Sequence, residues 1–185
     1  MKKILAILMI LVLSVGIISC KNEEETPQVE EPVVEEPVEE IPEPETIKVT
    51  LYFANEKYIE IGDESLQKLI PEIREIENTE DNLEEAIVRA LMEDPESDNL
   101  RTVIPSSTKL NGVEVADGTA FVDFARDGMH GGSLQETFTI YQIVASLIEL
   151  DTVDRVQFLI DGEIDDSLMG HYSIDVPFDN VEGYK

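Results

Sequence analysis

Two histidines are the side chains of this 185-residue chain best suited to transfer protons near neutral pH. His130 lies in the glycine-rich segment RDGMHGGS, and His171 follows Gly170 in a predicted turn. Nucleophilic catalysis needs a base beside a placed nucleophile, but the sequence contains no G-x-S-x-G elbow and no H-E-x-x-H zinc motif. We therefore predict a structural hydrogen bond for His171 and a surface position for His130. We expect no catalytic residue, cofactor or metal.

An acidic segment also has spacing that could bind a cation. Asp161, Glu163 and Asp165 alternate as in the first half of a calcium-binding loop. The sixth position of such a loop needs glycine and the twelfth needs a bidentate glutamate, but Asp166 and Tyr172 occupy them here. We interpret this segment as a solvated acidic turn.

Residues 127–132 form a glycine-rich segment directly before a predicted helix. Backbone N–H groups at a helix start can bind an anion, which is one interpretation of this segment. A flexible connection between two elements also explains the glycines, and we favour that interpretation.

The single cysteine, Cys20, ends an apolar run that follows two lysines. The run Ile4–Ile18 is short for a membrane span, which needs about 20 apolar residues, and suits a secretory signal. With Ser19 before the cysteine, the pattern resembles the lipobox of bacterial lipoproteins. This resemblance implies that residues 1–19 are a lipoprotein signal peptide and that Cys20 carries lipid, including palmitate. The mature chain would then be anchored at the extracytoplasmic face of the cell membrane.

Residues 20–46 have the composition of a disordered tether, because glutamate and proline dominate and few apolar residues are present. The whole chain contains 41 acidic and 13 basic residues, with a formal net charge of −28. Such a charge repels nucleic acid and anionic lipid surfaces. We therefore expect no nucleic-acid partner, and we expect the lipid on Cys20 to provide the membrane contact.

The remaining residues, 47–185, have the patterns of one domain. Alternation of apolar and polar residues predicts strands over 47–53 and 153–160 and weaker extended segments over 58–61, 73–76 and 172–176. Apolar residues at three- and four-residue spacing predict helices over 79–94 and from Ser133 onward. The order of these elements predicts an α+β fold, with two main helices on one face of a largely antiparallel sheet.

Local signals define several ends of these elements. Asp117-Gly118 between two alternating runs predicts a β-hairpin over 108–125 with a type I′ turn. Thr79 is the predicted N-cap of the first helix, and Ser133 with Glu136 predicts a capping box at the second. Pro71 predicts a loop rather than a helix before residue 73.

Several segments in sequence resemble the GerMN domain of spore-germination and sporulation lipoproteins. They are LIPEIREIE (69–77), ALMEDP (90–95), TVIPSSTKLNGVEVADGTAFVDFA (102–125), IVASLIELDTVDRVQFLIDGE (143–163) and GHYSIDVPF (170–178). Together they cover most of residues 47–178, in a single copy. The resemblance implies a fold akin to the ring-building motifs of secretion systems and of the sporulation channel. It also implies a non-enzymatic role in assembly or envelope binding.

We therefore expect a membrane-anchored lipoprotein whose GerMN-like domain contacts a protein partner, itself or peptidoglycan in sporulation, germination or cell-envelope organisation. Two alternatives remain open, namely an envelope enzyme that acts on the cell wall and a solute-binding lipoprotein. Loss of activity on cell wall after a change at His171 would favour the enzyme. A deep apolar pocket with convergent polar groups would favour solute binding.

Overall fold

The computed structural model describes residues 46–77 and 82–184. The predicted signal peptide and Cys20 lie outside the described residues, as does the predicted tether except for Thr46. The elements are β1 (Thr46–Asn55), α1 (Glu56–Ile61), β2 (Leu69–Glu77), α2 (Leu83–Met92), β3 (Leu100–Arg101), β4 (Leu110–Ala116), β5 (Thr119–Phe124), α3 (Ser133–Leu147) and β6 (Arg155–Ile160). Among the described residues, no helix is both long and apolar enough to cross a membrane.

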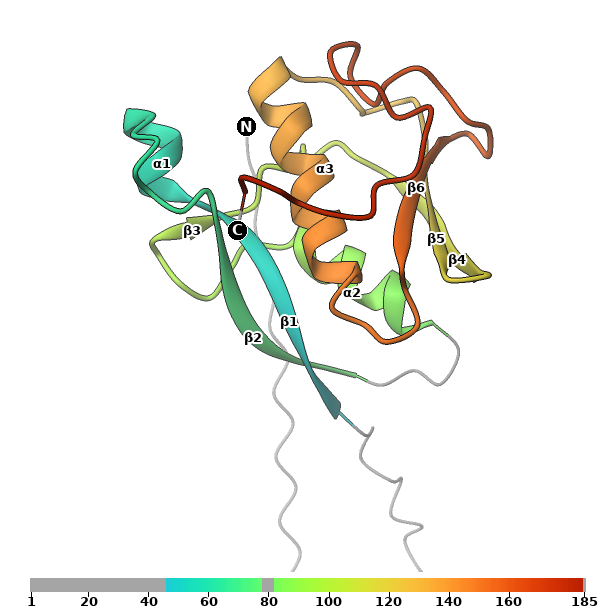
Figure 1. Ribbon diagram of the computed structural model, residues 1–185, viewed down its shortest axis with the longest axis horizontal. Helices are drawn as coiled ribbons and strands as arrows, with labels where there is room; N and C mark the ends of the chain where they lie inside the picture. Colours follow the sequence, from blue (N-terminus) through green and yellow to red (C-terminus); the bar gives the residue numbers. More distant parts are fainter. Residues whose placement is uncertain (1–45, 78–81, 185) are drawn as a thin grey trace, which may run out of the picture. The chain divides into compact units, whose positions relative to one another are not determined.

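The strands form two three-stranded sheets, with the orders β2-β1-β3 and β4-β5-β6 (Figure 1). The first sheet is antiparallel, whereas β5 and β6 in the second sheet are parallel. The predicted α+β class is confirmed, but the expected single antiparallel sheet is divided in two. The parallel pair arises because α3 connects β5 to β6, and a helical crossover returns the chain to the same end of the sheet.

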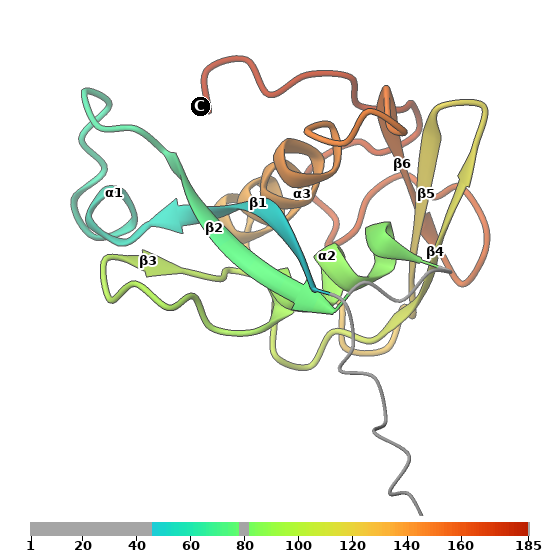
Figure 2. The same ribbon diagram turned by 90° about the horizontal axis from the view of Figure 1, so that it is seen from below.

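Helix α3 lies between the two sheets and packs against β1 of one and β6 of the other (Figures 1 and 2). The predicted deep packing of this helix is confirmed. Its buried residues are Glu136, Phe138, Thr139, Ile140, Gln142, Ile143, Val144, Ala145, Ser146 and Leu147. Helix α2 contacts α3, β1 and β4, so both main helices share one apolar core.

Residues 58–61, which were predicted to be extended, belong to the short helix α1. The side chain of Asn55 accepts a hydrogen bond from the Lys57 N–H at 3.1 Å and caps the helix start. Gly62 ends the helix in the left-handed conformation, with its N–H donating to Tyr58 O at 2.8 Å. These two caps outweigh the weak alternation that favoured a strand.

The first long strand pair includes Pro71, where a loop was predicted. Pro71 lies within β2 opposite Tyr52 of β1. It is tolerated because β2 is an edge strand and a proline there can face away from its partner. Residues 73–76 are part of this strand, as predicted.

The end of β2 is joined to α2 by residues 78–81, which lie outside the description together with the predicted N-cap Thr79. Helix α2 starts at Leu83, and its N-cap is Asn82, whose side chain accepts from the Glu85 N–H at 3.0 Å. The Asn82 amide also donates to Val113 O at 2.9 Å, so the cap fastens α2 to β4.

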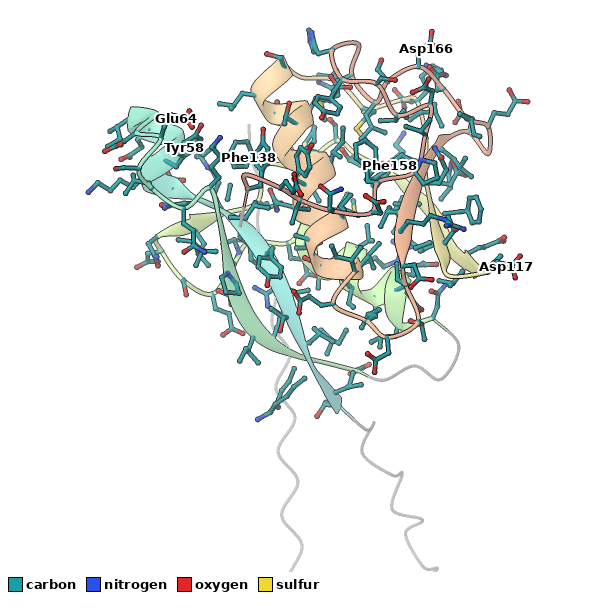
Figure 3. The ribbon with its side chains drawn as sticks, viewed as in Figure 1. Tyr58, Glu64, Asp117, Phe138, Phe158 and Asp166 are labelled. Atoms are coloured by element: carbon teal, nitrogen blue, oxygen red, sulfur yellow. The ribbon has the colours of Figure 1, made fainter. Side chains whose placement is uncertain are left out.

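The chain after β6 crosses α3 toward the first sheet (Figure 1). The predicted strand over 172–176 is absent, and this segment makes only an isolated bridge between Ser167 and Ser173. The Gln157 side chain of β6 donates to Ile174 O at 2.8 Å. Tyr184 stacks on Tyr141 of α3 with 4.1 Å between ring centroids. Figure 3 shows the neighbouring contact, in which Tyr58 of α1 lies beside Phe138 of α3 with centroids 5.7 Å apart. The final segment therefore completes the core.

The hairpin of β4 and β5 is confirmed, including its turn. Asp117 and Gly118 both have positive φ, at 50° and 71°, as a type I′ turn requires. Figure 3 shows Asp117 at the tip of this hairpin. A Cβ atom at Gly118 would collide with Asp154 Oδ2, but this exposed side chain can turn away, so the position needs glycine for its conformation.

An ion pair of Glu72 and Arg74 joins β2 to the end of α2. Arg74 Nη2 lies 2.7 Å from Glu72 Oε1, and both side chains are nearly buried. Glu72 Oε2 accepts from the N–H groups of Glu96 and Ser97, each at 3.1 Å. Burial raises the pKa of Glu72, but these N–H groups and the guanidinium outweigh burial and lower it.

Replacement of Gly118 by alanine should lower the free energy of unfolding by about 1–2 kcal/mol, because a residue with a Cβ atom is strained at a positive φ. Gly162→Ala is the matched comparison, since its φ is 81° and its Cβ would meet no atom within 4 Å. That variant should lose a similar amount, because the exposed Asp154 side chain beside Gly118 can turn away. Chemical denaturation of both variants tests this, and a much larger loss in Gly118→Ala would contradict it.

Acid should weaken the protein partly through Glu72. Because the folded-state pKa of Glu72 is lowered from 4.5, its contribution is present above that value and is lost as pH falls through the folded-state pKa. The free energy of unfolding should therefore decrease less between about pH 6 and about pH 3 in Glu72→Gln than in the wild type. Urea denaturation across this range measures both slopes, and parallel slopes would disprove the assignment.

Candidate functional site

The first turn of α3 contains a buried carboxylate, that of Glu136, whose exposed fraction is 0%. Its Oε1 accepts a hydrogen bond from the Met169 N–H at 2.7 Å. Its Oε2 accepts from the N–H groups of His171 at 2.8 Å and Tyr172 at 3.1 Å. Hydrogen bonds to a charged acceptor are among the stronger ones in proteins. Glu136 therefore fixes the loop that follows β6 against the start of α3.

The capping box predicted for Ser133 and Glu136 is wrong. Gly132 is the N-cap of α3, and no side chain caps it. The reason is competition for one carboxylate, because the loop presents three N–H groups that would otherwise lie buried without partners. Glu136 satisfies these donors and does not turn back to the helix end.

The two loops that carry the histidines meet beside Glu136. His171 Nε2 lies 3.2 Å from the carbonyl oxygen of Gly131, so the predicted structural hydrogen bond of His171 is present. Gly131 also lies close to two side chains, because a Cβ atom there would lie 2.5 Å from Gln135 Oε1 and 2.8 Å from Met169 Sδ. The ring of His171 thus joins the loop of 127–132 to the loop after β6.

The rest of the glycine-rich segment is acidic where an anion would have to bind. His130 is exposed, in agreement with its predicted surface position. Asp127 accepts a hydrogen bond from Lys109 Nζ at 2.6 Å, and this bond lowers the pKa of the Asp127 carboxyl. With Glu136 in the first turn of the helix, a carboxylate already lies at this helix start. The arrangement favours a connecting role over anion binding.

The acidic turn that resembles a calcium loop is occupied by a cationic side chain. Arg126 pairs with Asp165 and lies 3.9 Å from Asp161, and its hydrogen bond lowers the pKa of the Asp165 carboxyl. Asp166, at the position where the calcium loop needs glycine, instead accepts the Ile174 N–H on its carbonyl oxygen at 3.1 Å (Figure 3). Within residues 46–77 and 82–184, no group of three or more potential ligand side chains is placed to hold a metal ion.

A shallow groove of about 400 Å³ runs beside this end of α3, and we call it the α3 groove. Its apolar lining includes Ile59, Val103 and Leu134, and Leu134 is 50% exposed. Gln135 donates to Val103 O at 3.0 Å, which holds the groove wall to the helix. The groove offers a shallow surface for contact, and its polar lining residues are Arg101, Thr102, Ser106 and Gln135.

Sequence reasoning assigned Glu136 to the wrong role, although a signal for its burial was present. Glu136 is spaced four, seven and eleven residues from Ile140, Ile143 and Leu147, and these three residues are fully buried. An acidic residue that continues a buried helical stripe must find donors inside the protein. The donors come from a segment more than thirty residues away, which no local pattern reveals.

Replacement of Glu136 by alanine should lower the free energy of unfolding by about 3–5 kcal/mol, because three buried N–H groups lose their acceptor. Glu136→Gln should lose about 1–3 kcal/mol, since one oxygen becomes a donor. Glu163→Gln, at an exposed acid of the same loop region, is the control and should change little. Hydrogen exchange at His171 and Tyr172 should accelerate only in the Glu136 variants, and unchanged protection would contradict this role.

Comparison with known proteins places the chain in a family. The profile of the family described as "Germane: Sporulation and spore germination" matches residues 50–166. Among solved structures, the tandem GerMN domains of the sporulation protein GerM from Bacillus subtilis share 20% identity, with a TM-score of 0.58 over 74% of this chain and 46% of that chain. The first GerMN domain of the same protein shares 16% identity, with a TM-score of 0.56 over 69% of this chain and 92% of that chain.

A structure assigned as a lipoprotein from Clostridium perfringens shares 24% identity, with a TM-score of 0.49 over 72% of this chain and 87% of that chain. No curated protein matches the chain. The chain spans less than half the length of the tandem GerM structure. The fold is that of GerMN domains, and the chain belongs to the Germane family of sporulation and spore germination proteins.

Proposed function

We propose that this protein is a lipid-anchored, non-enzymatic binding module that assembles with a protein partner at the extracytoplasmic face of the cell membrane. In this proposal the protein acts in sporulation, germination or envelope organisation, and the description of its family supports the first two. Cys20 carries the lipid, and the acidic segment that follows it separates the domain from the membrane. Peptidoglycan is a further surface that the domain contacts.

The non-enzymatic part of the proposal rests on one observation. The side chains that could do chemistry are engaged in hydrogen bonds and ion pairs within the domain. Both oxygens of Glu136 are occupied by backbone N–H groups, and the His171 ring lies against Gly131 O. Asp165 is paired with Arg126, and Asp127 with Lys109. A general base or nucleophile needs an atom that can reach a substrate. These groups instead hold loops in place, which supports a rigid surface for binding.

The anchor is tested by production of the full chain and of Cys20→Ala in the native host, with metabolic labelling by a palmitate analogue and fractionation of the cells. The full chain should be labelled and recovered with the membrane, and the variant should lose both the label and the membrane association. Mild crosslinking followed by mass spectrometry should recover a discrete envelope protein with the full chain only. An unlabelled full chain in the soluble fraction would refute the anchor.

The absence of enzymatic activity is tested separately on purified cell wall. The mature chain, His171→Ala and Glu163→Gln should all release no soluble fragments from peptidoglycan. Release by the wild type and by Glu163→Gln, with loss of release in His171→Ala, would refute a non-enzymatic module and favour an envelope enzyme.

A further inference from the structure

In the described part of the chain, no strand pairs with the outer edge of β2. The Asn55 N–H donates to Lys68 O at 2.9 Å, so these opposite residues bond to each other across the first sheet. Bonded pairs alternate along an antiparallel ladder, so Ile70, Glu72, Arg74 and Ile76 also face β1. The intervening residues of β2 direct their N–H and C=O groups away from β1. We call the row of these outward-facing N–H and C=O groups the outer edge of β2.

Two contacts support this direction. The Leu69 N–H donates to Tyr184 O at 2.9 Å, so the C-terminal segment already uses the first outward donor of β2. On β1, Tyr52 lies opposite Pro71, and its N–H donates to Ser146 Oγ at 2.9 Å. The backbone N–H of Tyr52 therefore points away from β2, as expected for this pair. Pro71 has no N–H to offer. The remaining outward donors are those of Ile73, Glu75 and Glu77.

The side chains at this edge lie in solvent. Ile73 is 71% exposed, the highest value among the large apolar residues in the described part of the chain. Glu75 pairs with Lys48 at 3.4 Å, and both side chains are mostly exposed. Natural edge strands are usually protected by charge, proline or a covering segment. Pro71 protects the start of this edge, but an exposed isoleucine beside open donors leaves a place where another strand can bind.

A second copy of this chain fits the edge poorly. Antiparallel pairing centred on Ile73 would place Pro71 opposite Glu75 of the second copy, where no proline N–H can bond. It would also place Leu69 opposite Glu77 of the second copy, although the Leu69 N–H is already bonded to Tyr184 O. Each copy has a formal net charge of −28, and the two would repel each other. Charge complementarity therefore favours a basic partner.

We propose that the outer edge of β2, from Pro71 to Glu77, binds an extended segment of a partner protein by strand addition. On the exposed face, this segment places basic side chains opposite Glu75 and Glu77 and an apolar side chain opposite Ile73. Backbone hydrogen bonds supply affinity, and the acidic and apolar positions supply selectivity. The inference rests on the proposed binding function and adds the chemistry of the partner.

The probe is a synthetic peptide, Lys-Thr-Lys-Thr-Val-Thr-Val, which in antiparallel pairing sets lysines against Glu77 and Glu75 and valine against Ile73. Binding to the mature chain, without its lipid, is measured by titration with NMR detection of backbone amides. The amides of Ile73, Glu75 and Glu77 should shift and become protected from exchange. The matching peptide with glutamates in place of lysines should not bind, nor should the lysine peptide with N-methyl groups on its edge-facing amides.

Variants of the edge separate strand addition from general attraction between opposite charges. Glu75→Pro removes one outward donor and one charge but leaves the β1 ladder intact, so it should weaken binding about tenfold or more. Glu75→Gln should weaken it less, and Pro71→Thr should tighten it about threefold through an added donor. Glu114→Gln, at an exposed acid on β4, is the matched control and should bind as the wild type does. Unchanged thermal midpoints verify the fold of each variant.

The proposal is overturned if the lysine peptide does not bind, if Glu75→Pro and Glu114→Gln bind it equally, or if the shifted amides line the α3 groove. Since the assay uses purified components, it does not depend on the lipid at Cys20. Loss of membrane association in cells would refute the anchor and leave this result intact.

Discussion

Buried polar side chains of α3 complete the backbone hydrogen bonding of the elements that surround the helix, and the rest of the fold depends on this. Ser146 Oγ accepts from the Tyr52 N–H on the edge of β1 that faces away from β2, beyond the two residues that pair with β3. Gln142 Oε1 accepts from the Val103 N–H at 3.1 Å, and Glu136 accepts from the loop after β6. Buried backbone donors without partners are costly, so the helix replaces strands at these positions.

This arrangement also determines which surfaces are available for binding. Because Ser146 of α3 takes the Tyr52 N–H on the side of β1 away from β2, this part of the first sheet is open on the β2 side, where Ile73 and Glu75 have outward donors. The carboxylate of Glu136, for which the sequence predicts a helix-capping role, is fully engaged in holding a loop. The buried polar groups of α3 bond backbone groups of the domain, whereas the exposed edge of β2 is accessible to a partner.

Features set by nearby residues could be predicted from the sequence, whereas features set by distant contacts could not. The type I′ turn at Asp117 and Gly118 follows from local conformational preference, and the apolar stripe of α3 follows from helical spacing. The role of Glu136 depends on His171 and Tyr172, and the acceptance of Pro71 depends on the edge position of β2. The division into two sheets follows from the crossover through α3, which alternation along single strands does not reveal.

The most direct test of this account is native-state hydrogen exchange of the wild-type domain at the Tyr52 and Val103 amides. Neither amide is bonded to a strand, yet each donates to a buried side chain of α3. If these side chains replace strand partners, both amides should exchange as slowly as those of the core of β1 and only through global unfolding. Exchange at the rate of surface loops would contradict the central role of α3.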